Sequence, residues 1–284
     1  MNEKIKDRTL NCRGTLLNLN TPIVMGILNV TPDSFSDGGQ FLVKEAALQQ
    51  VGKMLDEGAD IIDIGAYSSR PGAQEIDAEE EFGRLNAVVP AILEQFPTAI
   101  LSLDTFRSEV AGPMLEQGIH IINDISAGTH DAAILDLAAK FDAPYMLMHM
   151  QGTPKSMQQA PTYADVVEEV CDFFVERINA ARNAGIKDIV LDPGFGFGKA
   201  QNHNYQLFRN LEQLQVFGLP ILVGLSRKSM LYKMFDTTPD DVLELASALH
   251  MKALDAGANI LRVHDVKAAK RIIQLQQYLL NGAV

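Results

Sequence analysis

Residues 42–65 read LVKEAALQQVGKMLDEGADIIDIG, and they hold one complete helix-to-strand unit. Apolar residues recur at helical spacing up to Leu55, and Gly58 can adopt the left-handed conformation that ends a helix. Residues 60–65 then form a short, nearly continuous apolar run, which is typical of a strand buried on both faces of a parallel sheet. The stretch therefore predicts a helix followed by a buried parallel strand.

The same unit recurs along the chain. We count eight short apolar runs, each followed by an amphipathic segment, and no linker rich in Pro, Gly or Ser divides them. Eight such units predict a (β/α)8 TIM barrel in a single domain over residues 1–284, in preference to a large open α/β sheet. Residues 1–20 predict a short N-terminal hairpin that caps the bottom of the barrel. The predicted strands are 23–28, 60–65, 99–103, 119–123, 144–149, 188–191, 219–225 and 258–263, and the predicted helices are 42–58, 78–95, 107–117, 131–140, 163–184, 204–214, 240–256 and 266–280.

The composition excludes several classes of protein. The chain has 36 acidic and 24 basic residues and a net charge of −12, which argues against a nucleic-acid or anionic-membrane partner because both bind basic surfaces. Its two cysteines, Cys12 and Cys171, lie far apart and form neither a disulfide framework nor a zinc ligand set. No apolar run approaches the ~18 residues of a membrane-spanning helix, and the charged start lacks the apolar core of a signal peptide. We therefore expect a soluble, cytoplasmic protein.

Polar residues follow every predicted strand, at the end of a barrel that carries the chemistry in this fold. A single Asp or Asn there is as readily a helix cap as a functional group, and Asp63 and Asp124 are open to either interpretation. Polar groups after all eight strands favour a binding site instead. They are Asn29, Asp63, Asp104, Asn123, Asp124, His149, Asp192, Arg227, Lys228, Arg262 and His264.

The chemistry of this ring indicates two kinds of ligand group. Cations after the last two strands suit a phosphate, and Arg262 lies inside an apolar run, where an unpaired guanidinium would be costly. The carboxylates and the amide on the other side suit a flat heterocycle of the guanine or pterin kind. The loops GFGFG (194–198) and GLSRKS (224–229) match neither dinucleotide nor Walker motifs. No zinc motif occurs, so a metal would be Mg²⁺ shared with phosphate oxygens.

The motifs together resemble those of the dihydropteroate synthase family over nearly the whole chain. They are MGILNVTPDSFSDGG (25–39), DIGAYSSRPGA (63–73), SLDTFR (102–107), INDISAG (122–128), MHMQGTP (148–154), LDPGFGFGK (191–199), GLSRKSM (224–230) and LRVHDV (261–266). The resemblance implies a homodimeric TIM barrel that joins 6-hydroxymethyl-7,8-dihydropterin diphosphate to 4-aminobenzoate. It further implies a dissociative mechanism and Mg²⁺ as cofactor.

The resemblance also implies a role for individual residues. The pterin would bind Asp104, Asn123, Asp192 and Lys228, between walls formed by Met148 and Gly224. Diphosphate would bind Asn29, Arg70, Arg262 and His264, with Asn29 also at the metal. The aminobenzoate pocket would contain Phe35, Ser69, Arg70, Pro71, Phe197 and Ser226. The residues expected to act in catalysis are Asp104, Arg70, Lys228, Arg262 and His264.

One loop departs from the family pattern. Where the family more commonly has GGESTRPGA, this chain has GAYSSRPGA, so Ala66 and Tyr67 replace Gly and Glu, and Ser69 replaces Thr. Two alternatives share the same pterin-binding barrel: a methyltetrahydrofolate–corrinoid methyltransferase and a non-catalytic pterin-binding protein. The first should lack the SRPGA loop and the SRK cluster, and the second should have lost more loop residues, so both are disfavoured.

Overall fold

The computed structural model describes residues 8–30, 39–68, 75–153, 157 and 160–282. Eight parallel strands form one sheet in the order β8-β7-β6-β5-β4-β3-β10-β9, and a bridge between Leu191 and Ile221 joins its two edges into a barrel. The predicted TIM barrel is therefore confirmed. The strands are β3 (Ile23–Asn29), β4 (Ile61–Gly65), β5 (Leu101–Asp104), β6 (Ile121–Asp124), β7 (Tyr145–Met148), β8 (Ile189–Asp192), β9 (Leu222–Val223) and β10 (Ile260–Val263).

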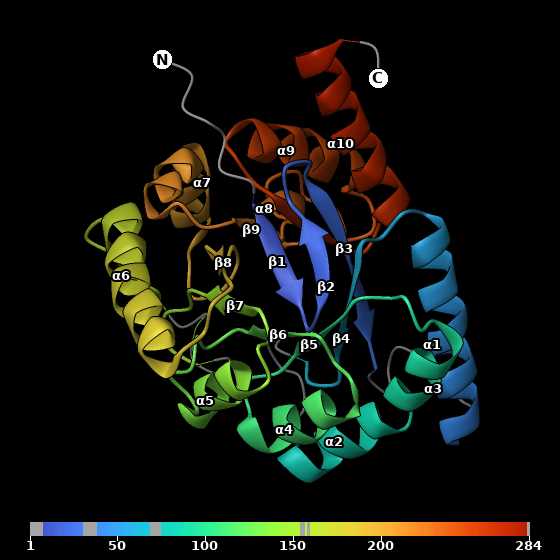
Figure 1. Cartoon of the computed structure of the whole chain (residues 1–284). Coiled ribbons are helices and arrows are strands. Elements are labelled where there is room, and N and C mark those ends of the chain that lie inside the picture. The colour runs from blue at the N-terminus through green and yellow to red at the C-terminus, as the bar shows by residue number, and fades with distance from the viewer. Residues whose placement is uncertain (1–7, 31–38, 69–74, 154–156, 158–159, 283–284) are drawn as a thin grey trace.

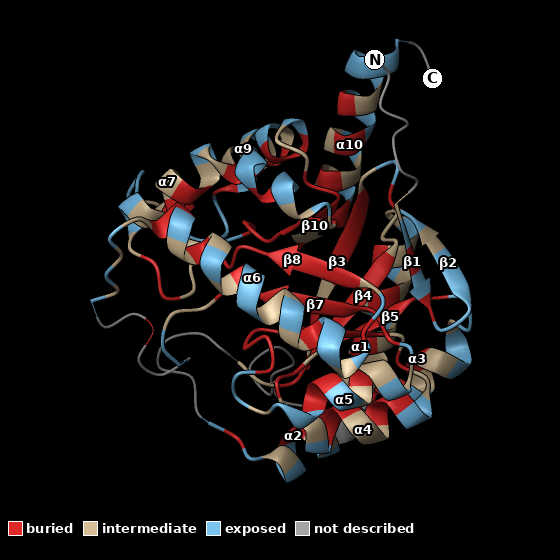
Figure 2. Ribbon diagram, turned by 60° about the vertical axis from the view of Figure 1, so that its left-hand side comes forward, coloured by how far each residue is buried: buried red, intermediate tan, exposed pale blue. Residues whose placement is uncertain are grey.

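Helices surround the barrel (Figure 1). They bury the face that packs on the strands and expose the other, as their period of 3.6 residues requires (Figure 2). The helices are α1 (Gly39–Asp56), α2 (Ala78–Asn86), α3 (Val89–Gln95), α4 (Ser108–Gln117), α5 (Ala133–Lys140), α6 (Val166–Ala184), α7 (Gln201–Arg209), η2 (Leu211–Phe217), α8 (Ser229–Tyr232), α9 (Leu243–Asp255) and α10 (Val266–Asn281). Among the described residues, no helix is long and apolar enough to cross a membrane.

Two predicted helices are divided in the structure. The segment 78–95 forms α2 and α3, because Pro90 in the first turn of α3 has no N–H to donate and so favours a new helix start over continuation. The prediction of one helix over 204–214 is wrong in its bounds, since α7 starts earlier and is followed by the 3₁₀ helix η2. The four-residue α8 was not predicted, because one turn is too short to show helical periodicity.

The predicted hairpin lies at the bottom of the barrel. Strands β1 (Thr9–Cys12) and β2 (Thr15–Asn18) pair antiparallel and lie across the ring of strands (Figure 1). Their buried side chains Leu10 and Cys12, with Leu19, join the first residues of the barrel strands in one apolar cluster. The hairpin therefore closes this end of the barrel, and the opposite end carries the polar groups. The strand residues of that cluster are Ile23, Met25, Ile61, Ile121, Met146, Val190, Leu222 and Ile260, and Ile100, which directly precedes β5, belongs to it as well.

Candidate active site

A network of charged groups lies at the carboxyl ends of β4, β5, β6 and β10. Arg262 donates from Nε to Oδ2 of Asp63 (2.7 Å) and from Nη2 to Oδ2 of Asp104 (2.6 Å). Asn123 donates from Nδ2 to the same oxygen of Asp63 (3.0 Å). The strand order explains why these side chains lie close together, since β5 and β6 are neighbours and Asp104 lies opposite Asn123. The structure therefore brings three predicted site residues together around Asp63.

Asp63 belongs to this site, which the sequence left open between a structural and a functional role. Its side chain is fully buried, and its Oδ1 has no hydrogen-bond partner among the described residues. The available signal was its position inside the apolar run IIDIG, the same argument that marked Arg262. Asp124 is structural by contrast, because its carboxylate accepts from the backbone of Ser126 and Gly128 (both 2.7 Å) and from Tyr145.

The same network sets the ionisation of its members. Burial raises the pKa of Asp104 to about 7, against the lowering effect of Arg262 and with the help of Asp63. Burial opposes the charge of Arg262, but Asp63 and Asp104 together hold the pKa of the guanidinium above its ordinary value. Arg262 was expected to bind diphosphate, and the structure shows its guanidinium engaged by two carboxylates.

A second pair of charges lies beside this network at the ends of β8 and β9. Burial lowers the pKa of Lys228 to about 8, and the carboxylate of Asp192 opposes that shift. Lys228 donates to the carbonyl of Phe195, and its Nζ lies 4.3 Å from the centre of the Phe197 ring. Asp192 accepts from the backbone N–H of Gly194 (2.8 Å), and burial raises the pKa of its carboxyl. A half-buried lysine and a buried carboxylate thus lie side by side in this part of the site.

Apolar side chains border these charges. Phe106, Ile125 and Met148 form one buried cluster, and Tyr67, Met150 and Phe197 pack against it. Met148 lies opposite Asp192 on neighbouring strands. The predicted wall residue and the predicted aminobenzoate residue Phe197 therefore share one apolar surface. Such a surface, edged by a few fixed polar groups, suits a flat ring.

The remaining predicted residues lie around this centre. His264 Nδ1 lies 3.1 Å from Ser226 Oγ, so the ends of β9 and β10 are joined there. A Cβ on Gly224 would lie 3.9 Å from Cβ of Arg262, so the glycine borders the network. Asn29 ends β3 and is half-buried. Arg227, a candidate phosphate ligand, pairs instead with Asp240 (3.0 Å) and Asp265 (3.3 Å) on the surface.

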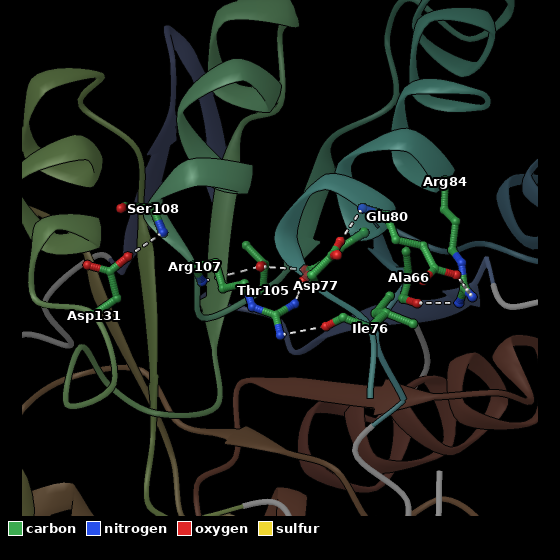
Figure 3. Close-up of polar contacts among 10 residues, drawn as sticks. Ala66, Ile76, Asp77, Glu80, Arg84, Thr105, Arg107, Ser108 and Asp131 are labelled. Carbon is green, nitrogen blue, oxygen red and sulfur yellow. Dashed lines mark hydrogen bonds and ion pairs between the residues drawn. The ribbon is translucent and has the colours of Figure 1, made fainter. Parts of the chain in front are cut away.

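The two ends of the segment 66–77 are anchored to the same side of the barrel (Figure 3). The Ile76 carbonyl accepts from Arg107 (2.9 Å), and Arg107 also pairs with the buried carboxylate of Glu81. Tyr67, one of the departures from the family pattern, meets Phe106 edge-on at 5.2 Å, and Arg107 lies 5.2 Å from its ring centre. Four residues predicted for the substrate site lie outside the described residues: Phe35, Ser69, Arg70 and Pro71.

Three or more His, Cys, Asp or Glu side chains do not gather into a metal-binding group anywhere in the described ranges. Asn29 at the end of β3 offers one amide oxygen, a hard ligand of the kind Mg²⁺ takes. Mg²⁺ commonly keeps few protein ligands and is held largely by substrate phosphates and water. The residues present therefore fit a metal ion that arrives with a diphosphate substrate.

Comparisons with known proteins extend over nearly the full chain. Residues 25–264 match the family described as pterin binding enzyme. The dihydropteroate synthase of Escherichia coli (strain K12) is 47% identical over 275 residues, which are 96% of this chain and 97% of that protein. The solved structure of Xanthomonas albilineans dihydropteroate synthase with 4-aminobenzoic acid has a TM-score of 0.91 at 42% identity and covers 98% of this chain and 100% of its own. A complex of that enzyme with 7,8-dihydropteroate gives 0.87 at 39% identity, covering 97% and 100%.

Proposed function

The chain belongs to the dihydropteroate synthase family of pterin-binding enzymes, and from this premise we propose how its own residues carry out the reaction. The enzyme condenses 6-hydroxymethyl-7,8-dihydropterin diphosphate with 4-aminobenzoate and releases diphosphate. The observation that carries the proposal is the pairing of Arg262 with Asp63 and Asp104 beside the Lys228–Asp192 pair. These groups lie next to an apolar surface of aromatic and aliphatic side chains, which suits a flat ring.

The pterin ring binds between these two charge pairs. The carboxylate of Asp192 accepts from the amino edge of the ring, and Lys228 donates to the ring carbonyl. Asn123 is already fixed by its bond to Asp63 (3.0 Å), so its amide is oriented before substrate arrives. Met148 supplies the apolar wall against one face of the ring. The donors and acceptors thus match the ring edge while the ring faces meet apolar atoms.

The first step is loss of diphosphate, which leaves a cation on the exocyclic methylene that is delocalised into the dihydropterin ring. Asp104 stabilises this cation, because a preorganised carboxylate close to developing positive charge lowers the barrier. Arg262 and His264 stabilise the negative charge of the leaving group. Asn29 is the residue that would hold Mg²⁺, and the ion would supply further neutralisation of that charge.

The second step is attack by the amine of 4-aminobenzoate. An arylamine is a neutral nucleophile, so the step requires no strong general base, and Phe197 and Ser226 border its pocket beside the pterin. The resemblance to the family implies that Ser69, Arg70, Pro71 and Phe35 also belong to that pocket. Exclusion of water from the active site protects the cation, which water would otherwise trap.

The decisive assay measures diphosphate released from the pterin substrate with and without 4-aminobenzoate. We expect release that depends on the pterin substrate and a dihydropteroate product that appears only with the amine. Asp104→Asn should lower turnover by about 10³-fold while leaving the fold intact, because it removes the charge opposite the cation. Transfer of a methyl group to a corrinoid, or pterin binding without turnover, would instead support one of the two alternative functions.

We further propose that the protein is a cytoplasmic homodimer. Both cysteines are free thiols, and burial raises the pKa of Cys12 to about 12, which keeps it unreactive and suits a reducing compartment. Leu275, Tyr278 and Leu279 lie on one face of α10 and are exposed at 48%, 55% and 70%, which supports a second copy covering them. Light scattering should give twice the 31.1 kDa chain mass, and a monomer at every concentration would contradict the dimer.

A further inference from the structure

We propose that Lys199 and His149 are positioning residues for Lys228, because they fix the loop 194–198 that Lys228 contacts. The proposal rests on the role of Lys228 in the proposed function. It concerns a buried lysine for which the reaction steps above have no use. That lysine lies on the opposite side of the loop from the active site.

Lys199 is surrounded by neutral acceptors. Its Nζ lies 2.8 Å from Nδ1 of His149, 3.0 Å from the carbonyl of Gly194, 3.1 Å from that of Phe197 and 3.3 Å from that of His149. The residue is 3% exposed, and burial lowers the pKa of the amine well below its ordinary value. A cation buried without a contacting carboxylate is unfavourable, and an apolar side chain of similar size would avoid that cost. Stability alone therefore does not explain a lysine here.

His149 holds the other end of this contact. Burial lowers the pKa of its imidazole to about 2, and the neighbouring Lys199 adds to the shift, so the ring is neutral. A neutral ring that accepts from Lys199 at Nδ1 carries its proton on Nε2. The ring packs edge-on against Phe173 at 4.9 Å. His149 thus ties the side-chain nitrogen of Lys199 to the end of β7.

The loop itself needs an external constraint. Gly194, Gly196 and Gly198 all have positive φ, at 67°, 81° and 59°. A Cβ on Gly194 would lie 1.9 Å from the carbonyl oxygen of His149, so the two backbones are in direct contact. Alternate glycines give a backbone with many accessible conformations. The hydrogen bonds from Lys199 to the carbonyls of Gly194 and Phe197 help to select one of them, together with the bonds from Gly196 N–H to Asn204 Oδ1 (2.7 Å) and from Phe197 N–H to the Gly194 carbonyl (3.0 Å).

The selected conformation is the one that Lys228 requires. The carbonyls of Gly194 and Phe197 face Lys199, whereas the carbonyl of Phe195 and the ring of Phe197 face Lys228. Gly196 lies between them, where a Cβ would come 3.1 Å from Cδ of Lys228. The loop therefore has one lysine on each side, and the buried one orients the acceptor and the ring that hold the other in place.

The test is Lys199→Met, which keeps the length of the side chain and removes its donors. We expect kcat/KM for the pterin diphosphate to fall on the order of 10- to 100-fold, since a misplacement of about 1 Å can cost 100-fold. The pH profile of kcat/KM should change as well. Its alkaline limb, which we assign to deprotonation of Lys228, should move to lower pH. The reason is that the Phe195 carbonyl and the Phe197 ring both favour the charged form of Lys228. A role confined to stability would lower the melting temperature and leave the limb in place.

The matched control is Tyr163→Phe. Its hydroxyl donates to the carbonyl of Gly198 (2.6 Å), so this variant removes a bond to the same loop away from the residues that Lys228 contacts. We expect its kinetics to stay within about twofold of the parent and its alkaline limb to stay in place, since a misplacement that reached Lys228 would cost far more. A shift as large as that of Lys199→Met would mean that any loosening of the loop suffices and would overturn the specific role of Lys199.

His149→Phe serves as the second variant and decides the matter if Lys199→Met fails to fold. It keeps a ring against Phe173 and removes the acceptor for Lys199. It should move the alkaline limb in the same direction as Lys199→Met does, but by less. The double variant should have the same pH profile as Lys199→Met alone, because the two residues act as one unit. Unchanged profiles in an active protein would overturn this proposal, whereas a parent protein that releases no diphosphate would overturn the proposed function itself.

Discussion

The two ends of the barrel are built from the same eight strands and differ in the kind of side chain that they bury. At the bottom, the first residues of the strands and the hairpin residues Leu10, Cys12 and Leu19 form one buried apolar cluster. At the top, the last residues include Asp63, which keeps a buried oxygen without a partner among the described residues, and Arg262. The buried carboxylates of Asp63 and Asp192 thus both lie at the top. The comparison indicates that the bottom supplies stability and the top supplies chemistry, and each prediction below tests that division.

Arg262→Met should have the largest effect, because it leaves the buried carboxylate of Asp63 and the half-buried carboxylate of Asp104 without their cation. Removing one partner from a buried pair costs about 3–5 kcal/mol, so the free energy of unfolding should fall by that order. Turnover should fall together with it. Denaturant unfolding and the diphosphate assay measure the two effects. If stability were unchanged, the ion network at the top would not be held as tightly as its distances of 2.6 Å and 2.7 Å indicate.

Leu10→Ala tests the opposite end. Removing a fully buried leucine should cost about 2–4 kcal/mol of unfolding free energy, while turnover well below the melting temperature should stay at the parent value. Leu16→Ala is the matched control in the same hairpin, since Leu16 is 71% exposed and its loss should cost little. A loss of turnover in Leu10→Ala at full folding would contradict the division between the two ends.

Asp104 should make stability depend on pH. Its pKa is raised to about 7 in the folded protein, so the folded state binds the proton more tightly than the unfolded chain. The contribution of Asp104 to stability is therefore highest below the ordinary carboxyl pKa of about 4 and falls as pH rises from there to about 7, by at most ~1.4 kcal/mol per pH unit. Asp104→Asn should flatten that part of the profile. An identical slope in the variant would assign the titration to another group.

Tyr67→Leu should have the smallest effect. It removes the ring that meets Phe106 and the guanidinium of Arg107, contacts worth about 0.5–1 kcal/mol at a partly exposed site. Thermal unfolding measures the change, with Val216→Ala as a control at a side chain that is 79% exposed. An effect of several kcal/mol would mean that the ends of the segment 66–77 are part of the core.

The sequence predicted the barrel because its strands are buried on both faces and its helices on one, so each leaves a distinct apolar pattern. The hairpin followed from the residues that precede the first strand. The division between α2 and α3 was missed because both helices share one apolar face and only Pro90 separates them. The turn α8 is too short for any periodicity.

The site was predicted in its membership more than in its contacts. Strand ends converge in a barrel, so Asp104, Asn123 and Arg262 were expected in one site, but with Arg262 among the phosphate cations on the side opposite Asp104 and Asn123. Partners are set by side-chain conformation, which no pattern encodes, and so the pairing of Arg262 with Asp63 and the placement of Arg227 on the surface came from the structure. The buried position of Lys199 was likewise invisible, because a lysine after a glycine loop is ordinarily solvated.

The hairpin at the bottom has a consequence for synthesis. The ribosome makes it before the barrel strands, yet its contacts lie far along the chain: Arg8 bonds Asn259, 251 residues later, and the backbone of Asn11 bonds Asp188, 177 residues later. The hairpin segment can complete these contacts only after Asn259 has left the ribosome. Until then the apolar lower ends of the finished strands stay partly uncovered, and such exposed surface is what chaperones bind. A segment translated before every barrel strand therefore completes its native contacts only when the last of them is made.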